Sequence, residues 1–219
     1  VIMLLLTIIL TTVIILVTEA QRRIPITYAG RGVRSGSDQS HLPIRINQAG
    51  MIPIIFAVSL VSFPAILGQF LSRATSEWMR TLAAQMTSLF QMNSPTYMIV
   101  YFALIIGFTY FYVSIVFQPE QVAENIQKRG GYIPGIRPGK QTAEYIGKVS
   151  NRLNLFGGIF LAIVAVLPVL IQSLFSSLSI GSVPMLISGA GMIIIAGTVL
   201  EIIRKINAQL IMHDYNKFY

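Results

Sequence analysis

The chain has 219 residues, of which 54% are apolar and only 11% are charged, and its mean hydropathy is +0.69. This composition excludes an ordinary soluble domain and predicts that lipid surrounds most of the chain. The lack of cysteine excludes disulfides and thiolate metal sites, and the isolated histidines His41 and His213 cannot form a metal centre alone. The formal charge of +8 is explained first by the basic bias of cytoplasmic loops.

Five apolar runs have about the length that crosses a membrane as a helix, and none of them contains Asp, Glu, Lys, Arg or His. They cover residues 1–17, 49–71, 96–118, 153–171 and 184–200. We therefore expect an all-α fold, a polytopic membrane bundle of five transmembrane helices. The chain starts inside an apolar run without a basic leader, so we expect it to be a fragment of a longer protein.

The connections between these runs predict the orientation. Loops 18–48 and 119–152 together hold eleven of the sixteen basic residues, whereas loops 72–95 and 172–183 hold two and none. The first pair is therefore expected to be cytoplasmic and the second pair external. The tail 201–219 is expected to be cytoplasmic, with a helix that continues from the last span, which places the start of the chain outside.

Small and helix-disturbing residues mark two of the spans. The second span contains Gly50, Pro53, Pro64 and Gly68. These residues suit a helix that bends during function, or they reflect only the higher proline and glycine content of membrane helices. In the last span, residues 189–191 (Gly-Ala-Gly) predict close packing against a neighbouring helix.

The external loop 72–95 contains apolar residues at helical spacing between Trp78 and Phe90. This pattern predicts an amphipathic helix. It lies either on the outer membrane surface or against the helical bundle.

No pattern in the chain indicates catalysis. There is no Ser/His/Asp arrangement, no glycine-rich phosphate loop and no His/Glu pair at metal-binding spacing. We therefore expect neither an enzyme nor a cofactor. The absence of ionisable residues in the spans also argues against an ion-coupled transporter.

Both cytoplasmic loops are longer than a simple connection requires, and both are rich in turn-forming residues. Residues 21–29 and 41–44 flank a glycine-rich tip and predict a β-hairpin. In the second loop, a helix over 119–129 precedes a turn-rich stretch, and a second helix starts at Thr142. Arg137 lies between two turns of that stretch and is expected to project into solvent.

Three separated motifs resemble, in order and from end to end, the C-terminal half of the bacterial SecY family. They are Gln21-Arg22-Arg23-Ile24-Pro25, His41-Leu42-Pro43 followed by Asn47, Ala49, Gly50, Ile52 and Pro53, and Pro134-Gly135-Ile136-Arg137-Pro138-Gly139 followed by Thr142. The resemblance implies two local departures: a tip at residues 30–39 that is shorter than in some relatives, and an expected start within the sixth of the family's ten spans.

The resemblance implies one half of a ten-helix clamp that forms the protein-conducting channel of the bacterial inner membrane. It implies partners: the N-terminal half of SecY, SecE, SecG, SecA, the ribosome with its RNA, signal peptides, translocating polypeptides and membrane lipids. No chemical step would be performed by the chain itself.

The resemblance also implies roles for single residues. Ile55 and Ile194 would belong to an aliphatic pore ring that seals around whatever passes. Ser59 and Phe63 would belong to a lateral gate that opens toward lipid. Ordinary helix packing would explain all four equally well from the residues alone.

Exposed basic residues of the two loops would contact SecA or the ribosome by pairing with carboxylates or phosphates. They are Arg22, Arg23, Arg31, Arg34, Arg137 and Lys140. Arg45 and Arg152, beside span ends, are expected only to set the topology and to bind anionic lipid.

Two alternatives remain at this point. The kinked second span would suit one half of a secondary transporter. The basic loops would suit a noncatalytic, insertase-like scaffold that docks ribosomes without conducting.

Overall fold

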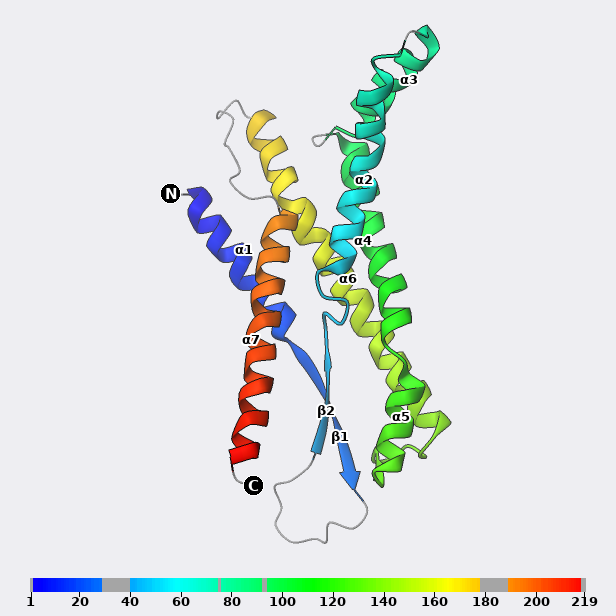
Figure 1. Ribbon diagram of the computed structural model, residues 1–219, viewed down its shortest axis with the longest axis vertical. Coiled ribbons are helices and arrows are strands. Elements are labelled where there is room, and N and C mark those ends of the chain that lie inside the picture. Colours follow the sequence, from blue (N-terminus) through cyan, green and yellow to red (C-terminus); the bar gives the residue numbers. More distant parts are fainter. Residues whose placement is uncertain (1, 29–39, 75, 92–93, 178–188, 218–219) are drawn as a thin grey trace.

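The computed structural model describes residues 2–28, 40–74, 76–91, 94–177 and 189–217. Arg31 and Arg34 lie outside these residues, as does the start of the last predicted span. Figure 1 shows the elements in chain order: α1 (Ile2–Glu19), β1 (Gln21–Tyr28), β2 (Ser40–Arg45), α2 (Ile52–Leu71), α3 (Glu77–Leu89), α4 (Pro95–Val116), α5 (Pro119–Lys128), β3 (Gly131–Tyr132), α6 (Lys140–Ser177) and α7 (Gly189–Lys217).

Three segments of the described chain are long and apolar enough to cross a membrane: Ile52–Leu71, Pro95–Lys128 and Lys140–Ser173. They correspond to the second, third and fourth predicted spans. The first predicted span corresponds to α1, whose apolar stretch Thr7–Glu19 is shorter, and the last is described only from residue 189 onward. The number of five membrane-crossing helices therefore stays a prediction.

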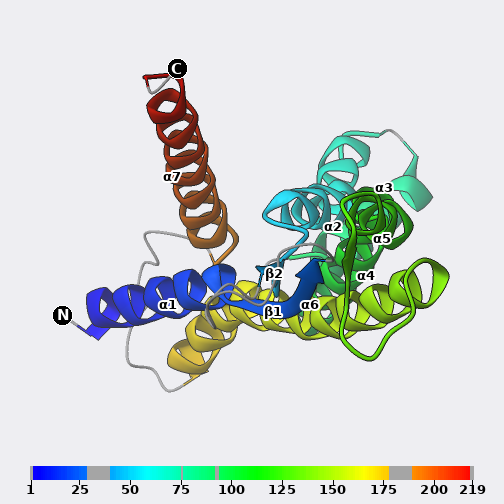
Figure 2. The same ribbon diagram turned by 90° about the horizontal axis from the view of Figure 1, so that it is seen from below.

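The two long loops lie at one end of the molecule. In Figure 1 the hairpin β1–β2, helix α5 and the C-terminal part of α7 are at the bottom, and α3 is at the top. Seen from below, α2 to α5 gather on one side, and α6 runs from them toward α1 (Figure 2). This arrangement agrees with the predicted grouping of the two basic loops and the tail on one side.

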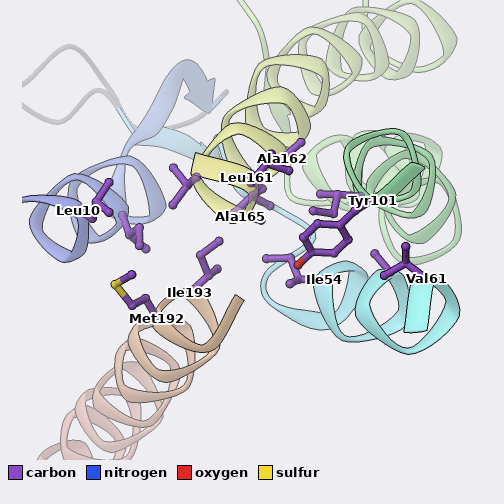
Figure 3. Packing of buried hydrophobic residues seen from close by; sticks show 14 of the residues in the cluster. Leu10, Ile54, Val61, Tyr101, Leu161, Ala162, Ala165, Met192 and Ile193 are labelled. Atoms are coloured by element: carbon purple, nitrogen blue, oxygen red, sulfur yellow. The ribbon is translucent and has the colours of Figure 1, made fainter. Parts of the chain in front are cut away.

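The main hydrophobic core is built from five helices, as Figure 3 shows. Ile54 and Val61 of α2 and Tyr101 of α4 lie on one side of Leu161 of α6, and Ile193 of α7 lies on the other side. Because α6 contributes buried residues toward both groups, it connects the pair α2–α4 with the pair α1–α7. Arg204 adds a polar link between α7 and α1, since its Nε donates to Glu19 Oε1 at 3.1 Å.

Glycine allows two of these helix contacts to be very close. A Cβ on Gly189 would stand 2.7 Å from the carbonyl oxygen of Ala165, so the backbones of α7 and α6 nearly touch, as residues 189–191 predict. A Cβ on Gly68 of α2 would stand 2.5 Å from Thr87 Oγ1 of α3. The amphipathic helix α3 therefore packs against α2, which corresponds to the bundle-packed alternative.

A small sheet joins the two loops. β1 pairs antiparallel with β2, which confirms the predicted hairpin, and β1 also pairs antiparallel with β3 of the second loop. The strand order is β2-β1-β3. Isoleucines of the hairpin (Ile24, Ile26, Ile44) and of the second loop (Ile126, Ile133, Ile146) form a second hydrophobic core beneath this sheet.

Candidate functional site

An uncharged stripe of exposed side chains runs along α2. Ile55, Ser59 and Phe63 share one helical face at spacings of four residues, and the exposed fractions of Ile55 and Phe63 are 43% and 54%. Ile66 and Phe70 extend the same face toward the outer end and are also exposed. The three predicted residues therefore lie together on a surface that no described part of the chain covers.

One contact between α2 and α7 places Ile55 and Ile194 at a similar position along the two helices. Thr198 Oγ1 of α7 lies 3.1 Å from Met51 Sδ, directly before α2. Ile55 follows Met51 by one helical turn and Ile194 precedes Thr198 by one turn, and the two helices run in opposite directions (Figure 1). Ile194 is only partly exposed, and its neighbour Ile195 is more exposed.

Two hydroxyls near the predicted pore residues form hydrogen bonds within their own helices. Ser59 Oγ donates to the carbonyl oxygen of Ile55 at 2.8 Å, and Thr198 Oγ1 donates to that of Ile194 at 2.7 Å. Both hydroxyls bond to the backbone one turn earlier, which makes them compatible with an apolar surrounding. The stripe therefore offers apolar contact and no charged binding group.

The open face of the three-stranded sheet, called the basic sheet face below, contains only exposed residues. Alternation along the strands and the pairing register place these residues on it: Gln21, Arg23, Pro25 and Thr27 of β1, His41, Pro43 and Arg45 of β2, and Tyr132 of β3. None of them is acidic. Arg22 belongs to the opposite side, because it pairs with the buried Ile44.

Arg45 and His41 were not among the predicted docking residues. Arg45 pairs with Gln21 and is therefore a diagonal neighbour of Arg23 across the strands. The signal was present in the sequence, since the alternation of apolar and polar residues in the two strands indicates which residues share a face once a hairpin is assumed.

Arg137 lies between two turns in the segment that joins β3 to α6, as predicted. Gly135 and Gly139 adopt positive φ angles of 82° and 94°, a region that favours glycine. Thr142, which is buried at the start of α6, donates its hydroxyl to the carbonyl oxygen of Arg137 at 2.9 Å. The Arg137 side chain is exposed, so a rigid turn holds a guanidinium out to solvent.

Lys140 belongs to the lining of a groove that also contains acidic residues. The groove lies between α5 and α6, has a volume of about 640 Å³ and includes Glu120, Glu124 and Glu144 in its lining. Glu124 is partly neutralised by Lys128, whose Nζ lies 2.7 Å from Glu124 Oε1. The groove thus carries glutamates beside Lys140, whereas the basic sheet face carries no acidic residue.

A family model described as SecY matches residues 1–203. The chain belongs to the SecY family.

Two relatives of this family give the extent of the similarity. The chain is 43% identical over 212 residues to the protein translocase subunit SecY of Halalkalibacterium halodurans and 40% identical over 211 residues to that of Corynebacterium glutamicum. These matches cover 94% and 92% of this chain but 46% and 47% of the relatives. The chain therefore spans about half the length of the SecY relatives it matches.

Two solved structures share this fold. One is described as "The structure of a protein conducting channel" and another as a study of how the plug domain of SecY stabilises the closed channel. Both align with a TM-score of 0.57 over 89% of this chain and 46% of the other, at 19% and 18% identity. This likeness shows a shared arrangement of elements.

Proposed function

We propose that the chain is the C-terminal half of a SecY channel, which conducts secreted proteins and inserts membrane proteins. The order of the three recognised motifs, and the match to about half of each relative, support this assignment. The channel would work without chemistry of its own, so the energy for transport comes from its partners.

The observation that carries the proposal is the uncovered stripe on α2. A stripe of Ile55, Ser59 and Phe63 without any ionisable group suits a surface that parts from another helix and closes again. In the complete channel, Ile55 and Ile194 contribute to the pore ring, and Ser59 and Phe63 contribute to the lateral gate toward the N-terminal half. Signal peptides, translocating polypeptides and lipids would contact this surface.

The basic end supplies the docking surface. Arg23 on the basic sheet face, together with Arg22, Arg31, Arg34, Arg137 and Lys140, binds SecA or the ribosome through carboxylates or phosphates. The position of Arg45 adds it to this set. SecE and SecG complete the assembly.

We infer the bacterial inner membrane as the location, with five spans, the start of the chain outside and the C-terminal end in the cytoplasm. The shared end of the two basic loops and of the C-terminal part of α7 supports this orientation.

Charged substitutions in the pore ring test the proposal. The complete channel carrying Ile55→Lys or Ile194→Lys should leak ions across liposomes and accept defective signal sequences, because a charged ring stays hydrated. Ile55→Leu is the matched control, since it keeps an aliphatic seal. Tight liposomes and unchanged signal selectivity in both lysine variants would contradict the pore assignment and would favour a docking scaffold.

A further inference from the structure

The segment that leads into α2 is fastened to α6 by a buried polar cluster. Ser150 Oγ donates to Gln48 Oε1 at 3.0 Å, and Asn154 Nδ2 donates to Ser150 Oγ at 3.3 Å. Ser150 and Asn154 are one turn apart on α6 and are only 2% and 3% exposed. We call these three side chains the polar cluster.

The contact is also sterically close. A Cβ on Gly157 would stand 2.7 Å from the carbonyl oxygen of Ile46, two residues before Gln48. Gly157 lies on the same face of α6 as Ser150 and Asn154, at spacings of seven and three residues. The face of α6 that receives this segment is therefore shaped for it over two turns.

Two atoms of the polar cluster have no hydrogen-bond partner in the described structure. Gln48 Nε2 is a buried donor and Asn154 Oδ1 is a buried acceptor, and neither is paired. Unpaired buried polar atoms are unfavourable, yet these two are complementary and belong to one cluster. A direct bond between the Gln48 and Asn154 amides would satisfy both atoms, so the cluster has a second way of pairing besides the bonds through Ser150.

On one side, the polar cluster is connected to the Arg137 turn. α6 runs without a break from Lys140, and Thr142 near its start holds the carbonyl of Arg137. At 1.5 Å per residue, Ser150 stands about 15 Å along the helix from Lys140. A displacement of the turn therefore reaches Ser150 and Asn154 through a rigid helix.

On the other side, the polar cluster is connected to the exposed stripe of α2 that contains Ile55. Gln48 precedes Met51 by three residues, and the amide of Ile55 donates to the carbonyl oxygen of Met51 at 3.4 Å. Asn47 Oδ1 accepts from the amide of Gly50 at 2.9 Å, which stiffens the short connection. Movement of Gln48 therefore moves the start of α2 and with it Ile55.

We propose that Gln48 and Asn154 are positioning residues, which with Ser150 transmit a displacement of the Arg137 turn to α2. The proposal rests on the proposed channel function and names a coupling route inside it. A partner that docks at the turn shifts α6, the polar cluster exchanges its bonds, and α2 follows.

The test separates docking from transport in the complete channel. Gln48→Met and Asn154→Leu remove the amides while nearly keeping the side-chain volume. Each variant should bind SecA with unchanged affinity, and transport of a secretory substrate per bound SecA should fall about fivefold, as expected for the loss of one net hydrogen bond. Transport by the double variant should be no lower than transport by the more impaired single variant, because both changes break the same route.

Asn151→Leu is the matched control, since Asn151 is the exposed neighbour of Ser150 on α6. It should transport normally. Unchanged transport in Gln48→Met and Asn154→Leu, or a loss that follows SecA affinity or thermal stability, would overturn the coupling route while leaving the channel intact. A wild-type channel that transports nothing would instead refute the proposed function.

Discussion

The pairing of β1 and β2 gives two adjacent arginines different surroundings. Arg23 stands on the basic sheet face, whereas Arg22 is paired with Ile44 on the side of the second hydrophobic core. Residue type and motif do not distinguish the two arginines, because both are basic and both lie in the same motif. Only the register separates them.

Charge reversal at these positions should therefore have unequal effects. We expect Arg23→Glu and Arg45→Glu each to weaken partner docking about tenfold, since a charge-assisted contact becomes repulsive. Arg22→Glu is the comparison variant within the docking set, and it should weaken binding less, because Arg22 lies on the opposite side of β1 from the basic sheet face. Binding to SecA and to ribosomes at two salt concentrations measures the effect. Equal losses for Arg22→Glu and Arg23→Glu would contradict the basic sheet face as the docking surface.

Arg137 allows a second prediction for a single residue. Replacement by glutamate should lower SecA-driven export about tenfold without unfolding the chain, because the side chain is exposed and only the backbone carbonyl is bonded. Export by Arg137→Lys should lie between export by the wild type and by Arg137→Glu, since lysine keeps the charge but lacks the planar guanidinium group. Export at limiting SecA is the measurement, and export equal to wild type would remove Arg137 from the docking set.

Helix packing depends on backbone contacts that are set by glycine. Gly189→Ala should lower the free energy of unfolding by about 1–3 kcal/mol, because the added Cβ meets the carbonyl oxygens of Val164 and Ala165, which cannot swing away like a side chain. Gly107→Ala on α4 is the control, since a Cβ there meets nothing within 4 Å. Thermal unfolding in detergent compares them, and equal midpoints would contradict the close α6–α7 contact.

Most elements could be predicted from local patterns. The apolar runs, the turn residues of the hairpin and the spacing in loop 72–95 are local features, and α1 to α7 and the hairpin correspond to them. The strand β3 could not be predicted, because its two residues pair with Thr27 and Tyr28 on another loop. The polar cluster was missed for the same reason, since Gln48 and Ser150 are far apart in sequence and meet only when α6 packs.

At the scale of the molecule, the described helices α1, α2, α4, α6 and α7 all expose large apolar side chains. If the N-terminal half covers α2 in the channel, a cysteine at Ser59 should react quickly with a membrane-permeant thiol reagent in this chain alone and slowly in the assembled channel. The wild-type chain has no cysteine to interfere. Gln141→Cys on the exposed start of α6 should react equally in both states. Equal reactivity of the Ser59 variant would contradict α2 as the closing surface.

The three-stranded sheet also has a consequence for the order of synthesis. β1 leaves the ribosome about a hundred residues before β3, with α2, α3 and α4 in between. The hairpin can form early, but the sheet is completed only when the second loop has emerged and the intervening helices have brought it back. Completion of the sheet therefore depends on the packing of the helices between β1 and β3. A newly made chain would acquire the complete three-stranded sheet only after these helices have packed.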